Sequence, residues 1–163
     1  MLTPSMIEKL NHQVALEQYS ANLYLAMSAW CAHKGLEGSA HFLKVHSDEE
    51  LAHARKLFDY INETGALAVV SAVDAPPKEF GSLQEVFKKT LEHEKSITAA
   101  INTLVDTALG EKDYSTFNFL QWYVAEQHEE ERLFMSILDL FEIMESGGRS
   151  LFMIDREIAS KAK

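Results

Sequence analysis

The chain contains very little cysteine and little proline or glycine. Cys31 is the only cysteine in 163 residues. This excludes a disulfide framework and any centre built from several thiolates, such as a cysteine-ligated zinc or iron–sulfur site. Three prolines and seven glycines leave long uninterrupted stretches, and these stretches show neither strand-like alternation nor a repeat. The scarcity of helix-breaking residues therefore predicts long helices.

Positive charge and long apolar runs are also scarce. Fifteen Lys and Arg stand against 25 Asp and Glu, a formal net charge of −10, which argues against a nucleic-acid partner because a phosphate backbone requires basic side chains. No apolar run approaches the roughly 20 residues of a membrane span, and the segment MLTPSMIEKL lacks the regions of a signal peptide. We expect a cytoplasmic protein without a membrane partner, formed as a single domain over residues 1–163.

Capping residues and glycines predict two long helices in the first half of the chain. Thr3, followed by a proline, is expected to cap a helix that ends near residue 33. Gly35 begins a short turn, Ser39 is expected to cap the second helix, and Gly65 to end it. In the second half, the same signals predict two further long helices and a short one.

A capping box that begins at Ser82 opens the third helix, which is expected to end at Gly110. The fourth helix is expected to begin at Asp113 or Ser115 and to continue to about Glu145. Beyond Gly147 and Gly148, the chain has a short last helix at about residues 148–160.

The connection between Gly65 and Ser82 determines the predicted topology. A helix of about 26 residues is about 39 Å long, and a link of about 16 residues spans about 50 Å when extended. The link can therefore cross the whole bundle and make the second and third helices parallel. The predicted fold class is all-α: a four-helix bundle over about residues 4–145 with one long crossover, followed by the short fifth helix. The apolar segment ALAVVSAV of the crossover is expected to lie against something, for example a second subunit.

Each long helix carries ionisable or amide groups near the middle of an otherwise apolar stripe. The stripe follows alternating steps of three and four residues. Its polar members, in chain order, are Glu17, His46, Glu50, His53, Glu94, Gln127 and Glu130. Counted from the connecting turns, six of these groups are expected to lie at one level of the bundle, to within about one helical turn: Glu17, Glu50, His53, Glu94, Gln127 and Glu130.

Several buried carboxylates at one level need compensation. Burial of an ion costs on the order of several kcal/mol, and the stripes contain no Lys or Arg. Carboxylate oxygen with imidazole nitrogen suits iron, manganese or zinc, and the spacing of Glu50 and His53 places both on one helix face. Di-metal bundles combine a Glu from each of two helices with Glu-x-x-His from each of the other two. Here the fourth helix carries Gln127-x-x-Glu130 instead.

Other polar residues near the stripes have two interpretations. Glu49, Glu126 and Glu129 flank the stripes and are equally compatible with a solvated face. Tyr24 is most simply a core tyrosine, yet it could hydrogen-bond a ligand carboxylate. His46 is either structural or supports the ligands from behind.

At these residues the chain resembles the bacterial non-haem ferritins. The segments that carry the resemblance are IEKLN, MSAWC, EELAH, LFDYI, TFNFLQWYV and EQHEEE. The resemblance implies an enzyme, a ferroxidase, that oxidises Fe(II) with O2 or H2O2. It also implies storage of the Fe(III) product as a mineral inside a homo-oligomeric shell of twenty-four copies.

The resemblance further implies a set of iron ligands. For the first iron these are Glu17, Glu50 and His53. For the second they are Glu50, Glu94 and Glu130, with Gln127 nearby. A third iron site would use Glu49, Glu126, Glu129 and Glu130, and Tyr24 would belong to the catalytic residues.

The sequence also weighs against related functions. Haem is not expected, because the haem-binding relatives use a methionine in the second helix and residues 39–65 contain none. Rubrerythrin-type peroxidases would carry Cys-x-x-Cys pairs, and mini-ferritins build their site between subunits. The alternatives left open are a di-metal oxidase of an organic substrate, a radical-generating subunit using Tyr24, and a purely structural bundle.

Overall fold

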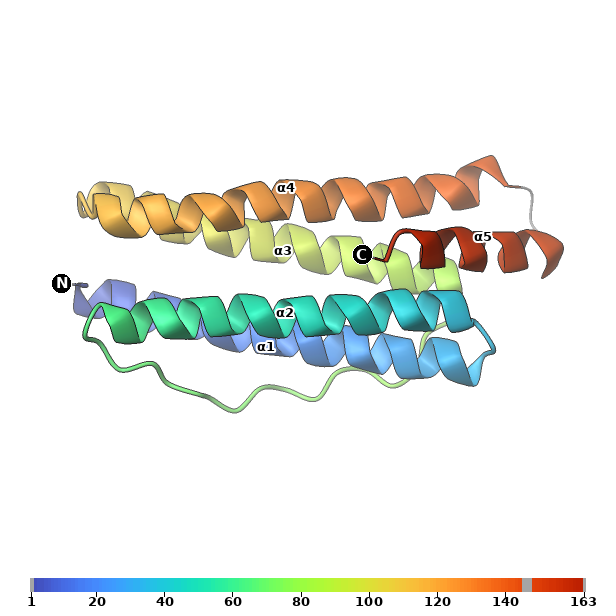
Figure 1. Ribbon diagram of the computed structural model, residues 1–163, viewed down its shortest axis with the longest axis horizontal. Coiled ribbons are helices and arrows are strands. Elements are labelled where there is room, and N and C mark those ends of the chain that lie inside the picture. Colours follow the sequence, from blue (N-terminus) through green and yellow to red (C-terminus); the bar gives the residue numbers. More distant parts are fainter. Residues whose placement is uncertain (1, 145–147, 163) are drawn as a thin grey trace.

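The computed structural model describes residues 2–144 and 148–162, and Figure 1 shows their helical arrangement. The helices are α1 (Pro4–His33), α2 (Glu37–Glu63), α3 (Leu83–Gly110), α4 (Tyr114–Ile143) and α5 (Gly148–Ser160). They confirm the all-α bundle with a short fifth helix. The expected end of the fourth helix at Glu145 and the expected break at Gly147 lie outside the described residues. None of the helices in these two ranges is long and apolar enough to cross a membrane.

Three of the predicted N-caps are confirmed by their hydrogen bonds. The side chains of Thr3, Ser82 and Asp113 each accept a hydrogen bond from the backbone N–H three residues ahead, at 3.0–3.1 Å. Such a bond satisfies a backbone donor that has no partner within the helix. The sequence signals at the starts of α1, α3 and α4 therefore act as expected.

The predicted cap of α2 is wrong. This helix begins at Glu37, two residues before Ser39, and its N-cap Leu36 makes no side-chain capping bond. Ser39 instead donates both its backbone N–H and its hydroxyl to Asp155 Oδ1, at 2.7 Å each, and the N–H of Gly38 donates to Asp155 Oδ2 at 2.9 Å. The Asp155 carboxylate of α5 thus accepts the hydrogen bonds at the start of α2 that the side chain of Ser39 was expected to accept. The approach is close, because a Cβ at Gly38 would collide with the backbone carbonyl of Asp155.

The long crossover has the predicted effect on topology. In Figure 1, α2 and α3 run in the same direction, and the link between them passes along the outside of the α1–α2 pair. Asn11 holds this link by donating to the carbonyl of Leu67 at 3.2 Å and accepting from the N–H of Val69 at 2.7 Å. Apolar side chains of the link remain exposed within one chain, with Leu67 at 75% and Val70 at 68%.

The buried apolar side chains form two clusters, one toward each end of the bundle. One cluster includes Met27, Phe42, Phe87 and Phe134, and the other includes Leu10, Leu57, Ile101 and Leu120. On every long helix, the predicted polar stripe residues occupy the sequence between these two sets. The core is therefore two apolar halves with a polar layer between them.

Candidate metal centre

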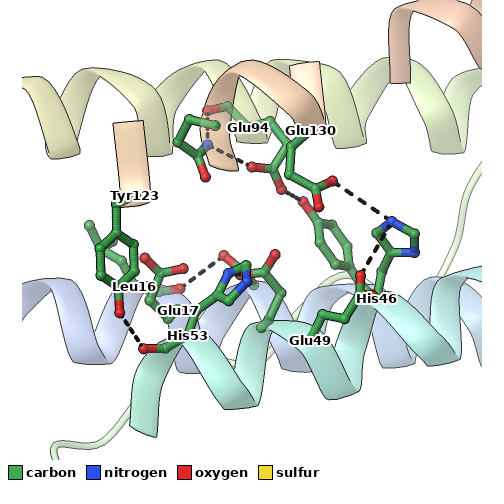
Figure 2. A network of polar contacts seen from close by, with 12 residues as sticks. Leu16, Glu17, His46, Glu49, His53, Glu94, Tyr123 and Glu130 are labelled. Atoms are coloured by element: carbon green, nitrogen blue, oxygen red, sulfur yellow. Dashed lines mark hydrogen bonds and ion pairs between the residues drawn. The ribbon is translucent and has the colours of Figure 1, made fainter. Parts of the chain in front are cut away.

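The polar layer is assembled from all four long helices. Its six central side chains are between 1% and 6% exposed. They are Glu17 of α1, Glu50 and His53 of α2, Glu94 of α3, and Gln127 and Glu130 of α4. Figure 2 shows Glu17 and His53 facing Glu94 and Glu130 across the space between the two helix pairs. The inward direction expected for these side chains is thus what the structure shows.

The first group of possible ligands consists of Glu17, Glu50 and His53. One ligand atom of each lies within 4.8 Å of the others, and His53 Nδ1 is 3.6 Å from Glu50 Oε2. Gln13 Nε2 donates to Glu17 Oε1 at 2.8 Å. The other oxygen, Oε2, is buried and receives no hydrogen bond from a donor among the described residues. A buried carboxylate oxygen without a donor suits a cation.

Burial dominates the electrostatics of the layer. It is the largest cause that raises the pKa of Glu17, and repulsion from Glu50 raises that pKa further. Burial followed by repulsion from Glu94 likewise raises the pKa of Glu50. Among the described residues, no Lys or Arg forms an ion pair with these three carboxylates. Without a cation, protons must therefore neutralise part of the layer.

Hydrogen bonds fix the orientation of Glu94 from two sides. Tyr24 Oη donates to Glu94 Oε1, and Gln127 Nε2 donates to Glu94 Oε2 at 2.9 Å. Burial raises the pKa of Glu94, and these two hydrogen bonds oppose that rise. Tyr24 therefore hydrogen-bonds a carboxylate of the layer, which is the second of the two interpretations given for it above.

Two residues beside the layer were not singled out from the sequence. Gln13 bonds Glu17, and the signal for it was its position four residues earlier on the same helix face. Tyr123 donates its hydroxyl to the backbone carbonyl of His53 at 2.8 Å. This bond joins α4 to α2, and nothing in the sequence specified it.

A second group of possible ligands lies beside the first. His46, Glu49 and Glu130 each place one ligand atom within 4.8 Å of the others. Glu126 and Glu129 line the same pocket, of about 620 Å³. The side chain of Glu49 is 39% exposed, so this group is open to solvent on one side. The structure therefore brings together the four glutamates expected at a third position and adds His46 to them.

Both groups combine oxygen and nitrogen donors of the kind that bind iron, manganese or zinc. Glu50 belongs to the first group and is repelled by Glu94 and Glu130, while Glu130 belongs to the second group. The layer can thus hold neighbouring divalent cations through shared carboxylates, and a cation would offset the repulsion described above.

Comparisons with known proteins identify the family. Residues 7–144 match the model of the ferritin-like domain. The chain is 57% identical to a probable bacterial non-heme ferritin-like protein of Haemophilus influenzae and 50% identical to the bacterial non-heme ferritin of Escherichia coli, covering 98% of this chain and 97% of the relative in both cases. An open-pore ferritin of Archaeoglobus fulgidus superposes with a TM-score of 0.95 at 40% identity over 98% of both chains. A Chlorobium tepidum ferritin gives 0.88 at 52% identity over 100% of both. The chain therefore belongs to the ferritin-like family, among the bacterial non-haem ferritins.

Proposed function

We propose that this protein stores and detoxifies iron in the cytoplasm, by oxidising Fe(II) with O2 or H2O2 within the polar layer and depositing Fe(III) as a mineral inside a shell. The observation that carries the proposal is the buried layer itself. Four helices contribute carboxylates at one level, and burial raises the pKa of three of them. Such a layer is unfavourable for folding alone, whereas it is suited to binding cations.

The chain's residues divide the work of binding Fe(II), the substrate. Glu17, Glu50 and His53 bind one ion. Glu50, Glu94 and Glu130 bind the second, so that Glu50 bridges the pair. Gln127 and Tyr24 hold Glu94 in position. Glu49, Glu126 and Glu129, with Glu130, bind a third ion at the open pocket.

The raised pKa values give the layer a role in proton movement. Carboxyl groups that hold protons in the metal-free protein release them when Fe(II) binds, because the cation stabilises the carboxylate. Each Fe(II) then gives up one electron to the oxidant. The flanking apolar clusters limit the access of water to the two central ions.

The exposed apolar side chains support assembly of many copies. Leu67 and Val70 of the crossover are 75% and 68% exposed, and Phe152 and Met153 of α5 are 61% and 52% exposed. Large exposed apolar patches are typical of protein contacts. The proposed assembly is a hollow shell of twenty-four copies, which requires these surfaces to be covered by neighbouring chains.

Particle size and iron capacity test this proposal together. A single bundle can bind only the two or three ions its ligands specify. We expect a large hollow particle by size exclusion and electron microscopy, and aerobic Fe(II) loading far beyond three ions per chain, with the iron co-eluting as a dense core. A monomer or dimer that saturates at two ions would contradict storage. That result would favour the di-metal oxidase instead.

A further inference from the structure

His46 is held in one orientation on α2. It is 3% exposed, its ring stacks on Phe42 with 4.1 Å between centroids, and it meets Phe134 edge-on at 5.5 Å. Its Nδ1 lies 3.0 Å from the backbone carbonyl of Phe42. Because a carbonyl only accepts hydrogen bonds, Nδ1 is the protonated nitrogen. Metal-binding histidines commonly make this bond, which directs Nε2 toward the metal.

The other ring nitrogen faces two carboxylates. His46 Nε2 is 3.6 Å from Glu49 Oε2 and 3.8 Å from Glu130 Oε2, as the dashed lines in Figure 2 show. These distances exceed those of a hydrogen bond. They are close to the separation of about 3.4 Å expected between two ligand atoms that each lie about 2.1 Å from one tetrahedral cation.

We propose that His46 Nε2 is a direct ligand of the third cation position, together with Glu49 and Glu130. The site then selects borderline divalent cations, such as Fe(II) and Zn²⁺, over the hard cations Mg²⁺ and Ca²⁺, because imidazole nitrogen favours the former. This inference rests on the proposed function, since Glu130 also serves the second central ion. It differs from the ligand set given by the family resemblance, which consists of carboxylates alone.

The pocket around this group argues for direct ligation over diffuse attraction. Arg132 and Lys161 line the pocket along with the glutamates and His46. Their positive charges oppose the acidic field, so charge alone is a weak means of retaining a cation there. The imidazole nitrogen of His46, whose ring is held by the Phe42 carbonyl, provides a specific means of retaining the cation.

Anomalous diffraction from crystals of the assembled protein soaked in Zn²⁺ tests the ligand directly. We expect a zinc peak at about 2.0–2.1 Å from His46 Nε2, with Glu49 and Glu130 as further ligands. A zinc ion in this pocket bound by carboxylates alone would overturn the proposal, as would zinc in the central layer with none in the pocket. Zinc in neither place would count against the proposed function itself.

A variant that keeps the ring but removes the nitrogen gives a second test. His46→Phe retains an aromatic ring against Phe42, and Glu49→Gln removes a carboxylate charge from the same group. In Zn²⁺ titrations of the assembled proteins, each change is expected to weaken one class of sites about 10–100-fold and to leave the tighter class at Glu17, Glu50 and His53 in place. Zn²⁺ titrated into the parent protein in millimolar Mg²⁺ should bind the pocket unchanged.

The comparison between the two variants decides between ligation and packing. Loss of pocket binding in Glu49→Gln but not in His46→Phe would show that the carboxylates bind the cation without the imidazole, and would overturn the proposal. Thermal melts and particle size verify that each variant is folded and assembled. If His46→Phe does not assemble, the zinc position in the parent crystals decides alone.

Discussion

The two groups of possible ligands use the same chemistry in different surroundings. Glu17, Glu50 and His53 are buried between the apolar halves of the core, whereas His46, Glu49 and Glu130 border a solvent-accessible pocket. Glu49 and Glu50 are neighbours in sequence, and the turn of about 100° between adjacent helical residues separates them. One carboxylate therefore points into the core while the next reaches its edge.

This difference in access to solvent, which comes from the partly exposed side chain of Glu49, predicts a difference in behaviour. In the buried group, removal from water raises the carboxyl pKa values, so cation binding is coupled to the release of protons. At the open group, ions can exchange with solvent through the pocket. We therefore expect fast two-ion chemistry in the buried polar layer and control of turnover at the open group.

Glu50→Ala should have the largest effect, because it removes the carboxylate proposed to bridge the two central ions. Rapid Fe(II) oxidation in stopped flow is expected to fall by at least about 100-fold. The metal-free variant should keep its helical circular dichroism, and its unfolding temperature should equal or exceed that of the parent, since one repelling charge is gone. Glu92→Ala, an exposed change on α3, is the matched control. Oxidation of Fe(II) at the parent rate in Glu50→Ala would contradict the proposal that the polar layer binds two ions through Glu50.

Asp155→Ala tests whether the open group depends on α5. The change removes the acceptor of three hydrogen bonds to the start of α2 and should lower the free energy of unfolding by about 1–3 kcal/mol. Because Lys161, which directly follows α5, lines the open pocket, the affinity of the open group for cations should change while that of the buried group does not. Denaturant unfolding and Zn²⁺ titration measure the two effects, with the exposed Asp139→Ala for comparison. Equal stability of the two variants would show that the cap contributes nothing.

The pH dependence of stability should separate buried from exposed carboxyl groups. Burial raises the native pKa of Glu17 above the ordinary value of 4.5, so the folded metal-free protein holds its proton longer than the unfolded chain does. The stability from this group is complete below pH 4.5 and is lost as the pH rises through the raised value. Glu17→Gln should therefore flatten the fall in unfolding temperature above pH 4.5.

Glu85→Gln provides the control for that measurement, because it removes the same charge. A hydrogen bond from Lys89 lowers the pKa of Glu85, so this group stabilises the folded protein above its ordinary pKa and is lost as a stabilising group in acid. The fall in unfolding temperature above pH 4.5 should be no flatter in Glu85→Gln than in the parent. If both variants flatten it equally, the cause is net charge and not burial of Glu17.

Changing Glu49, Glu126 and Glu129 together to Gln should have the smallest effect. The first two-ion oxidation is expected to stay rapid, because Glu17, Glu50, His53 and Glu94 are intact. Iron stoichiometry and the rate of repeated turnovers should change by a few fold. Anaerobic Fe(II) titration and successive Fe(II) additions measure both quantities. Curves identical to the parent would show that these three side chains only face solvent.

Local patterns predicted most of the fold. The periodicity of the stripes specifies the helix faces, and the caps at Thr3, Ser82 and Asp113 specify helix starts. Both signals act between residues only a few positions apart in the sequence. The length of the crossover specifies the direction of α3. The cap of α2 could not be predicted, because its acceptor Asp155 is 116 residues from Ser39. A sequence pattern records neighbours along the helix and not partners across the bundle.

The site was predictable to the extent that it follows the stripes. The inward position of Glu17, Glu50, His53 and Glu94 is confirmed, while their role as iron ligands stays a prediction. The bond from Gln13 to Glu17 and the orientation of His46 were not foreseen. The first depends on which rotamer fills the core, and the second on how the ring packs between aromatic neighbours.

The remote cap of α2 has a consequence for synthesis on the ribosome. Residues of α1 and α2 emerge long before Asp155, so any packing of this helix pair before α5 is made leaves the first backbone N–H groups of α2 without their carboxylate. Synthesis proceeds from the N-terminus, and here α5 completes the start of α2, which emerges much earlier. Release of a chain cut short before residue 155 would leave that helix start open to water and to proteases. The start of α2 is therefore complete only after α5 has been synthesised and has docked against it.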